Sequence, residues 1–236
     1  MDTFVSGCTS PRRSSVSSGG RASHVKKFRQ RYYDLFSRFY DQFVALHSRD
    51  DQQKSRDFLT EHAGVEQGDC ALDICSGTGS TLSRLQKRVG RDGLVVGVDF
   101  SRGMLTVAHV KTAGYHNVFL VEADVAYLPF KKTIFDAVTC SFAFYELKGK
   151  SHEHCLHEIG RVLKIRKPFL MMEHDVPKAC LIRMLYYLRL LSMGPKKAFE
   201  ILRHEKELLA GYFRYVDEIK APSGRTKIMI CKDYKN

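Results

Sequence analysis

Short apolar segments alternate with helical patterns between residues 70 and 174, and this alternation constrains the fold more than any other feature of the chain. Strand-like segments lie at residues 71–74, 94–98, 118–122, 135–141 and 169–173. Helical patterns lie among them at residues 81–89, 101–113 and 151–163, with Ser101 and Ser151 as the expected caps of the second and third helices. Strands that alternate with helices form a parallel sheet whose two faces are covered.

The C-terminal segment predicts a different strand pairing. Residues 215–221 and 226–232 flank the turn Pro222-Ser223-Gly224-Arg225, which is typical of a β-hairpin that closes a sheet. We therefore predict an α/β fold: a Rossmann-like, seven-stranded, mostly parallel sheet with a C-terminal antiparallel β-hairpin and a helical lid.

Other segments surround this sheet. Residues 1–25 are rich in Ser, Gly and Arg and predict a disordered basic tail. Residues 26–66 carry an aromatic-rich amphipathic pattern and predict an N-terminal helical lid. Residues 67–236 form the expected Rossmann-like domain, with a helical insertion at residues 178–211.

The net charge of +12 is concentrated at the two ends of the chain. Residues 1–31 carry seven basic and one acidic side chain, residues 178–236 carry 13 and six, and the segment between them is nearly neutral. A nucleic acid, an anionic membrane surface or an acidic substrate could use such basic ends. The seven cysteines include no CxxC pair, which indicates reduced thiols in an intracellular protein.

One turn carries the candidate chemistry. The segment Leu72-Asp73-Ile74-Cys75-Ser76-Gly77-Thr78-Gly79 is an apolar strand that enters a glycine turn ahead of a helix. Because Gly77 and Gly79 lack Cβ atoms, the backbone N–H groups of the turn can approach a ligand closely. Asp99 stands at the end of the next strand, where a carboxylate can bind both hydroxyls of a ribose.

The same turn distinguishes between nucleoside cofactors. A dinucleotide-binding turn has a third glycine, where this chain has Leu82. The acidic side chain of Asp73 would repel a pyrophosphate and attract a cationic amino-acid tail. The pattern therefore indicates S-adenosylmethionine rather than a nicotinamide dinucleotide.

Four sequence blocks resemble class I S-adenosylmethionine-dependent methyltransferases. The blocks are Asp73-Ile74-Cys75-Ser76-Gly77-Thr78-Gly79; Gly97-Val98-Asp99-Phe100-Ser101-Arg102-Gly103-Met104-Leu105; Ala123-Asp124 followed by Leu128-Pro129-Phe130 and Phe135-Asp136; and Glu158-Ile159-Gly160-Arg161-Val162-Leu163-Lys164. Within this class, the chain is most similar to the ubiquinone/menaquinone biosynthesis C-methyltransferases, a branch with the methyltransferase type 11 domain. It departs from that branch at residues 165–168, which lack the usual Pro-Gly-Gly, and at residues 141–147 after the fourth strand.

The resemblance implies S-adenosyl-L-methionine as the cofactor and assigns roles to matching residues. Asp73 is expected near the amino group of the methionine tail, Gly77 and Gly79 beside the tail and ribose, and Asp99 at the ribose. The remaining implied cofactor residues are Phe100 and Met104 at the adenine, Asp124 at its amino group, Ser141 beside the tail, and the turn and loop residues Cys75 and Val125.

Methyl transfer needs alignment of donor and acceptor, and a base only where the acceptor must lose a proton. The catalytic candidates near the strand ends are Tyr145, Glu146 and His174, with Asp175 beside them. The His- and Glu-rich segment at residues 152–158 has no metal-binding spacing, so we predict no metal site.

We predict a cytoplasmic methyltransferase for a small, lipophilic acceptor, either a quinone precursor or a phospholipid head group. Peripheral contact with an anionic membrane would fit the basic C-terminal segment, and the mitochondrial matrix is a second expected location. Two alternatives stay open: a nucleic-acid or protein methyltransferase that uses the basic ends, and a non-catalytic partner protein with this fold. Nucleic acid is the less favoured partner because Ser141-Phe142-Ala143-Phe144 replaces the motif of amino-methylating enzymes.

Overall fold

The computed structural model describes residues 51–144, 147, 150–175, 205–222, 224 and 226–235. The predicted basic tail at residues 1–25 lies outside this part of the chain. The described residues include only 51–66 of the predicted N-terminal lid and only 205–211 of the predicted insertion.

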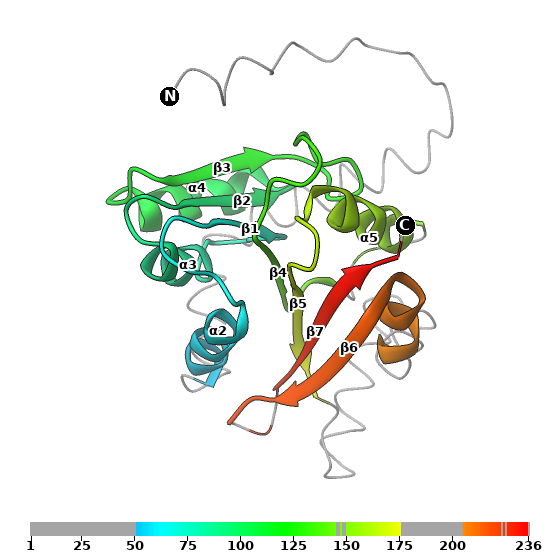
Figure 1. Ribbon diagram of the computed structural model, residues 1–236. Coiled ribbons are helices and arrows are strands. Elements are labelled where there is room, and N and C mark those ends of the chain that lie inside the picture. The colour runs from blue at the N-terminus through cyan, green and yellow to red at the C-terminus, as the bar shows by residue number, and fades with distance from the viewer. Residues whose placement is uncertain are drawn as a thin grey trace.

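Seven strands form one sheet in the order β3-β2-β1-β4-β5-β7-β6 (Figure 1). The strands are β1 (Cys70–Ile74), β2 (Leu94–Asp99), β3 (Val118–Glu122), β4 (Ala137–Ser141), β5 (Phe169–His174), β6 (Phe213–Lys220) and β7 (Thr226–Tyr234). The first five pair in parallel, whereas β7 runs antiparallel to both β5 and β6. The predicted seven-stranded, mostly parallel sheet with its C-terminal hairpin is therefore confirmed.

Helices cover both faces of the sheet because the parallel strands bury side chains in both directions. The helices are α2 (Asp51–His62), α3 (Leu82–Val89), α4 (Arg102–Thr112) and α5 (Ser151–Val162), and residues 205–212 are also helical. Leu59 of α2 and Leu85 of α3 share one core cluster. Leu156 of α5 and Leu209 of the last helix share the other.

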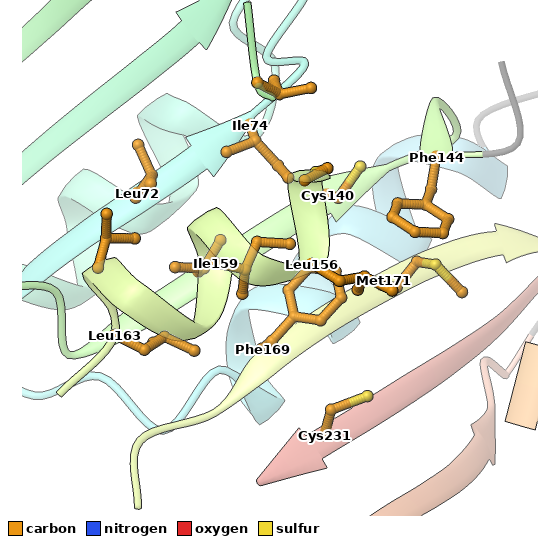
Figure 2. Close-up of a cluster of buried hydrophobic side chains, with 14 of the residues drawn as sticks. Leu72, Ile74, Cys140, Phe144, Leu156, Ile159, Leu163, Phe169, Met171 and Cys231 are labelled. Atoms are coloured by element: carbon orange, nitrogen blue, oxygen red, sulfur yellow. The ribbon is translucent and has the colours of Figure 1, made fainter. Parts of the chain in front are cut away.

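Alternate residues of β1 enter these two cores. Leu72 and Ile74 lie in the α5 cluster, which Figure 2 shows, whereas Ala71 lies in the α2–α3 cluster. All three side chains are fully buried. The strand at the centre of the sheet is thus fixed in register on both faces, and this places its C-terminal glycine turn.

The predicted start of α4 is confirmed, whereas those of α5 and β4 differ from the prediction. Ser101 caps α4 as predicted, since its hydroxyl accepts a hydrogen bond from the Met104 N–H at 3.2 Å. Ser151, in contrast, is the first residue of α5, and Lys150 holds the cap position without a side-chain bond. The fourth strand begins at Ala137 rather than at Phe135, because Phe135 makes only an isolated bridge to Leu163.

The packing of α5 on the sheet predicts that truncating a buried side chain and an exposed side chain of similar size will have very different effects on stability. Leu156→Ala removes a fully buried side chain and is expected to lower the free energy of unfolding by about 2–5 kcal/mol. Ile165→Ala, at a side chain that is 84% exposed, should change it by about 0.5 kcal/mol or less. Urea unfolding followed by circular dichroism measures both, and equal effects would contradict this core.

Candidate functional site

The glycine turn after β1 has a left-handed backbone at several positions. Cys75, Gly77 and Gly79 have φ angles of 52°, 53° and 76°. A Cβ atom on Gly79 would lie 2.9 Å from the Cβ of Ala108, so this glycine lets the turn pack against α4. A Cβ atom on Gly77 would meet nothing within 4 Å, so the space beside Gly77 is open among the described residues.

Asp99 connects this turn to the end of β2. Its Oδ2 accepts a hydrogen bond from the Gly77 N–H, and its Oδ1 accepts one from the Ser101 N–H, both at 2.9 Å. The residue is only 6% exposed. The predicted ribose-binding residue therefore lies at the turn and holds its backbone.

Three other predicted cofactor residues lie on the elements that follow β2. Phe100 is partly exposed at the start of the turn into α4, and Met104 is buried in the first turn of that helix. The Ala123 N–H donates to the Asp99 carbonyl at 3.1 Å, which holds the end of β3 beside the end of β2. This contact brings the segment that begins at Asp124 to the same edge of the sheet.

The loop after β3 is folded by its own side chains and by α5. The Asp124 Oδ1 accepts a hydrogen bond from the Ala126 N–H at 3.1 Å, and Val125 is buried. Arg161 donates to the carbonyls of Phe130 and Leu128 at 2.6 and 2.9 Å. It also donates to Glu158, whose other contact is the Leu128 N–H at 2.6 Å. This pair on α5 therefore holds the loop from both sides.

Asp73 is fully buried inside the sheet. Its Oδ1 accepts a hydrogen bond from the Thr139 hydroxyl at 2.6 Å, whereas its Oδ2 has no hydrogen-bond partner among the described residues. Burial raises the pKa of Asp73 to about 7, and the hydrogen bond from Thr139 and the positive charge of Arg56 act in the opposite direction. An orphaned carboxylate oxygen at this depth is suited to a cationic ligand group.

The remaining predicted cofactor residues lie where β1 and β4 end. The hydroxyls of Ser141 and Thr81 are 3.3 Å apart, so Ser141 contacts the start of α3. The Cys75 side chain hydrogen-bonds with Cys140, and this contact together with burial raises the pKa of the Cys140 thiol. All five cysteines in the described part of the chain are free thiols.

The four catalytic candidates differ in where they lie and in what they contact. Tyr145 and Glu146 lie outside the described residues. His174 ends β5 and its ring stacks on Phe142, with 4.4 Å between the ring centroids. Asp175 accepts a hydrogen bond from the Lys220 ammonium group at 2.9 Å and so belongs to an ion pair. Among the described catalytic candidates, His174 therefore lies beside Phe142, the residue that follows β4.

The site contains residues that the sequence analysis missed. Thr139 could have been found, because β1 and β4 pair in parallel and place it opposite Asp73. Arg56 and Phe142 had no such signal, since their approach depends on how α2 packs on the sheet. In the described part of the chain, no cluster of three His, Cys, Asp or Glu could hold a metal ion. No helix there is long and apolar enough to cross a membrane.

The chain is similar in sequence to known methyltransferases. Demethylmenaquinone methyltransferase of Staphylococcus aureus is 35% identical to this chain over 158 residues. The match covers 67% of this chain and 65% of the length of that relative.

Solved methyltransferase structures show the same fold. A SAM-dependent methyltransferase from Aquifex aeolicus superposes with a TM-score of 0.56 at 18% identity, covering 75% of this chain and 89% of its own. Geranyl diphosphate C-methyltransferase from Streptomyces coelicolor, solved with S-adenosyl-L-homocysteine, gives 0.55 at 11% identity, covering 77% and 75%. The sequence model of the ubiE/COQ5 methyltransferase family matches residues 23–201. The chain therefore belongs to the ubiE/COQ5 methyltransferase family, as the resemblance of its sequence blocks predicted.

Proposed function

We propose that this protein transfers the methyl group of S-adenosylmethionine to a ring carbon of a quinone precursor of the demethylmenaquinone type. The observation that carries the proposal is the contact between Asp99 and the Gly77 N–H, which holds a carboxylate beside the glycine turn where a nucleoside would bind. Membership of the ubiE/COQ5 family and the 35% identity to demethylmenaquinone methyltransferases support the choice of acceptor.

The residues present fit both the nucleoside end and the methionine end of S-adenosylmethionine. The open space at Gly77 admits a ligand next to the backbone, and the Asp99 carboxylate can accept hydrogen bonds from ribose hydroxyls. The unpartnered Oδ2 of Asp73 suits the ammonium group of the methionine moiety. The other proposed cofactor contacts are Cys75, Gly79, Phe100, Met104, Asp124, Val125 and Ser141.

The protein has two tasks in this reaction. S-adenosylmethionine supplies an electrophilic methyl carbon, and the site must align the acceptor carbon with it and exclude water. The acceptor carbon must then lose a proton as the aromatic ring is restored, and a base can accept it. His174 is the proposed base in the described part of the chain, and Tyr145 and Glu146 are further candidates.

The acceptor is tested by incubating the full chain with S-adenosylmethionine that carries a labelled methyl group. Demethylmenaquinol in detergent micelles should become labelled, whereas phosphatidylethanolamine vesicles, a nucleic acid and a protein mixture should not. Labelling of the phospholipid, the nucleic acid or the protein instead would overturn the proposed acceptor. Binding of S-adenosylmethionine without labelling of any acceptor would favour a non-catalytic partner protein.

The role of Asp99 predicts a loss of cofactor affinity. Asp99→Asn should weaken S-adenosylmethionine binding at least about tenfold, because one charged acceptor for the ribose hydroxyls is replaced by a neutral amide. Asp92→Asn, on the exposed loop before β2, should leave it unchanged. Calorimetric titration measures both variants, with NAD as a ligand control. Equal affinities of the two variants would show that Asp99 does not bind the cofactor.

The raised pKa of Asp73 predicts a pH dependence of binding. Because an ammonium group needs the ionised carboxylate, affinity for S-adenosylmethionine should rise between pH 5.5 and 7.5 and level off above the pKa of about 7. Below that pKa, each pH unit should weaken binding up to about tenfold. Asp73→Asn should bind more weakly, with a flatter profile. A wild-type affinity that is constant over this range would contradict the assignment.

A rise in pH should strengthen cofactor binding through Asp73 but weaken the stability of the ligand-free chain through the same carboxyl group. Between about pH 4 and 7 the unfolded chain loses the Asp73 proton while the folded chain keeps it, so this residue destabilises the fold increasingly as pH rises. Asp73→Asn should therefore gain stability over wild type across this window, by on the order of 4 kcal/mol at pH 7.5. Urea unfolding at pH 4.5 and 7.5 tests this, and a pH-independent difference would contradict it.

A further inference from the structure

Phe142 has an uncommon backbone conformation for a residue with a large side chain. Its φ angle is 55°, in the left-handed region that bulky residues rarely adopt because their Cβ atoms crowd the backbone. The conformation is held from the neighbouring strand, since the Phe142 N–H donates a hydrogen bond to the Met172 carbonyl of β5 at 2.8 Å. A strained conformation that the surrounding structure maintains in this way indicates a functional reason for it.

The left-handed conformation places the Phe142 ring on a face of the sheet that strand alternation would not give it. Along β4, Cys140 belongs to the α5 cluster, so alternation would return the side chain two positions later to that cluster. Phe142 belongs instead to the α2–α3 cluster, together with Leu170 and Met172 of β5. His174 continues the alternation of these two β5 residues and lies on the same face. The positive φ angle therefore turns the Phe142 ring toward His174.

The Phe142 ring covers one face of the His174 imidazole. The two rings are stacked, with 4.4 Å between their centroids and an angle of 27° between their planes. Phe142 is only 8% exposed, so its ring is fixed by the packing around it. An imidazole rotates broadly about its last side-chain bond, and a ring stacked against it restricts the imidazole plane. The lone pair that accepts a proton lies in that plane, so the same contact restricts its direction.

We propose that Phe142 is a positioning residue that holds the His174 imidazole in the orientation required to accept a proton from the methyl acceptor. The inference rests on the proposed function and deepens it, because it names the group that orients the proposed base. In that reaction the acceptor ring carbon gains the methyl group as the S–C bond breaks, and the electron pair of that bond stays on sulfur. The same carbon then loses its hydrogen as a proton to the imidazole, and the C–H electron pair restores the ring.

Substitutions at both positions test whether Phe142 acts through His174. The full-length chain is assayed with demethylmenaquinol in detergent micelles and S-adenosylmethionine that carries a labelled methyl group. Phe142→Leu should lower kcat about tenfold to a hundredfold, the cost of a displaced catalytic group, while affinity for S-adenosylmethionine stays within about threefold of wild type. His174→Ala should lower kcat about a hundredfold or more. Adding Phe142→Leu to His174→Ala should lower kcat by about threefold at most, because no imidazole is left to position.

Further variants separate orientation from packing. Phe142→Tyr keeps a flat ring and should retain kcat within about threefold of wild type. Phe144→Leu is the matched control, because Phe144 is fully buried in the α5 cluster and its ring contacts His152 instead. Any loss that Phe144→Leu causes should be the same fold-change with and without His174.

Calorimetric titration with S-adenosylmethionine shows whether each variant keeps a folded site. If Phe142→Leu does not bind it, Phe142→Met, which fills more of the space without a ring, takes its place in both backgrounds. Loss of binding in Phe142→Leu and Phe142→Met alike would show that the ring maintains the fold of the site, and the positioning role would be rejected.

The outcomes separate this inference from the function on which it rests. Absence of methyl transfer by wild type would overturn the proposed function and the inference together. Full activity of His174→Ala would overturn the assignment of the base, and with it the inference, but would leave methyl transfer to this acceptor in place. Equal fold-losses from Phe142→Leu with and without His174 would overturn only the inference, because the ring would then act through packing.

Discussion

The candidate site depends on the hydrogen bond between the Gly77 N–H and the Asp99 carboxylate. This contact joins the ends of two neighbouring strands, and it can form only because the turn after β1 has a left-handed backbone at Gly77 and Gly79. Gly79 also admits Ala108 of α4, and Ser101 donates to the second oxygen of Asp99. One carboxylate thus fixes the turn, the start of α4 and the floor of the proposed ribose site together.

Asp73 presents the opposite physical situation. Asp99 accepts hydrogen bonds from two backbone N–H groups, but among the described residues Asp73 accepts one only from the Thr139 hydroxyl, and it loses its hydration almost completely. Its raised pKa is the consequence, and it means that the ligand-free site carries a carboxyl group whose ionisation is unfavourable. A cationic ligand would relieve this cost. The two proposed cofactor carboxylates therefore differ in kind: Asp99 also holds the backbone of the turn, whereas Asp73 has an oxygen without a partner among the described residues.

The sequence allowed the sheet, its hairpin and the position of the glycine turn to be predicted because these depend on local patterns. Apolar segments of strand length, Ser101 as a cap and the spacing of glycines are all visible along the chain. Arg56 and Phe142 were missed because their proximity depends on the docking of α2, which no local pattern specifies. The cap of α5 was assigned wrongly because Ser151 and Lys150 differ by one position, within the ordinary uncertainty of helix ends.

Residues that local patterns predict and residues that depend on the docking of α2 also differ in what they can contribute to specificity. The turn and Asp99 are proposed to bind features that every nucleoside shares, so they do not distinguish the amino-acid end of the cofactor. Where α2, β4 and β5 approach one another, Phe142 contacts both Arg56 and His174. Because His174 is the proposed base, its stacking on Phe142 connects the acceptor side of the proposed site with α2. A change in the docking of α2 should therefore alter methyl transfer even where nucleoside binding is preserved.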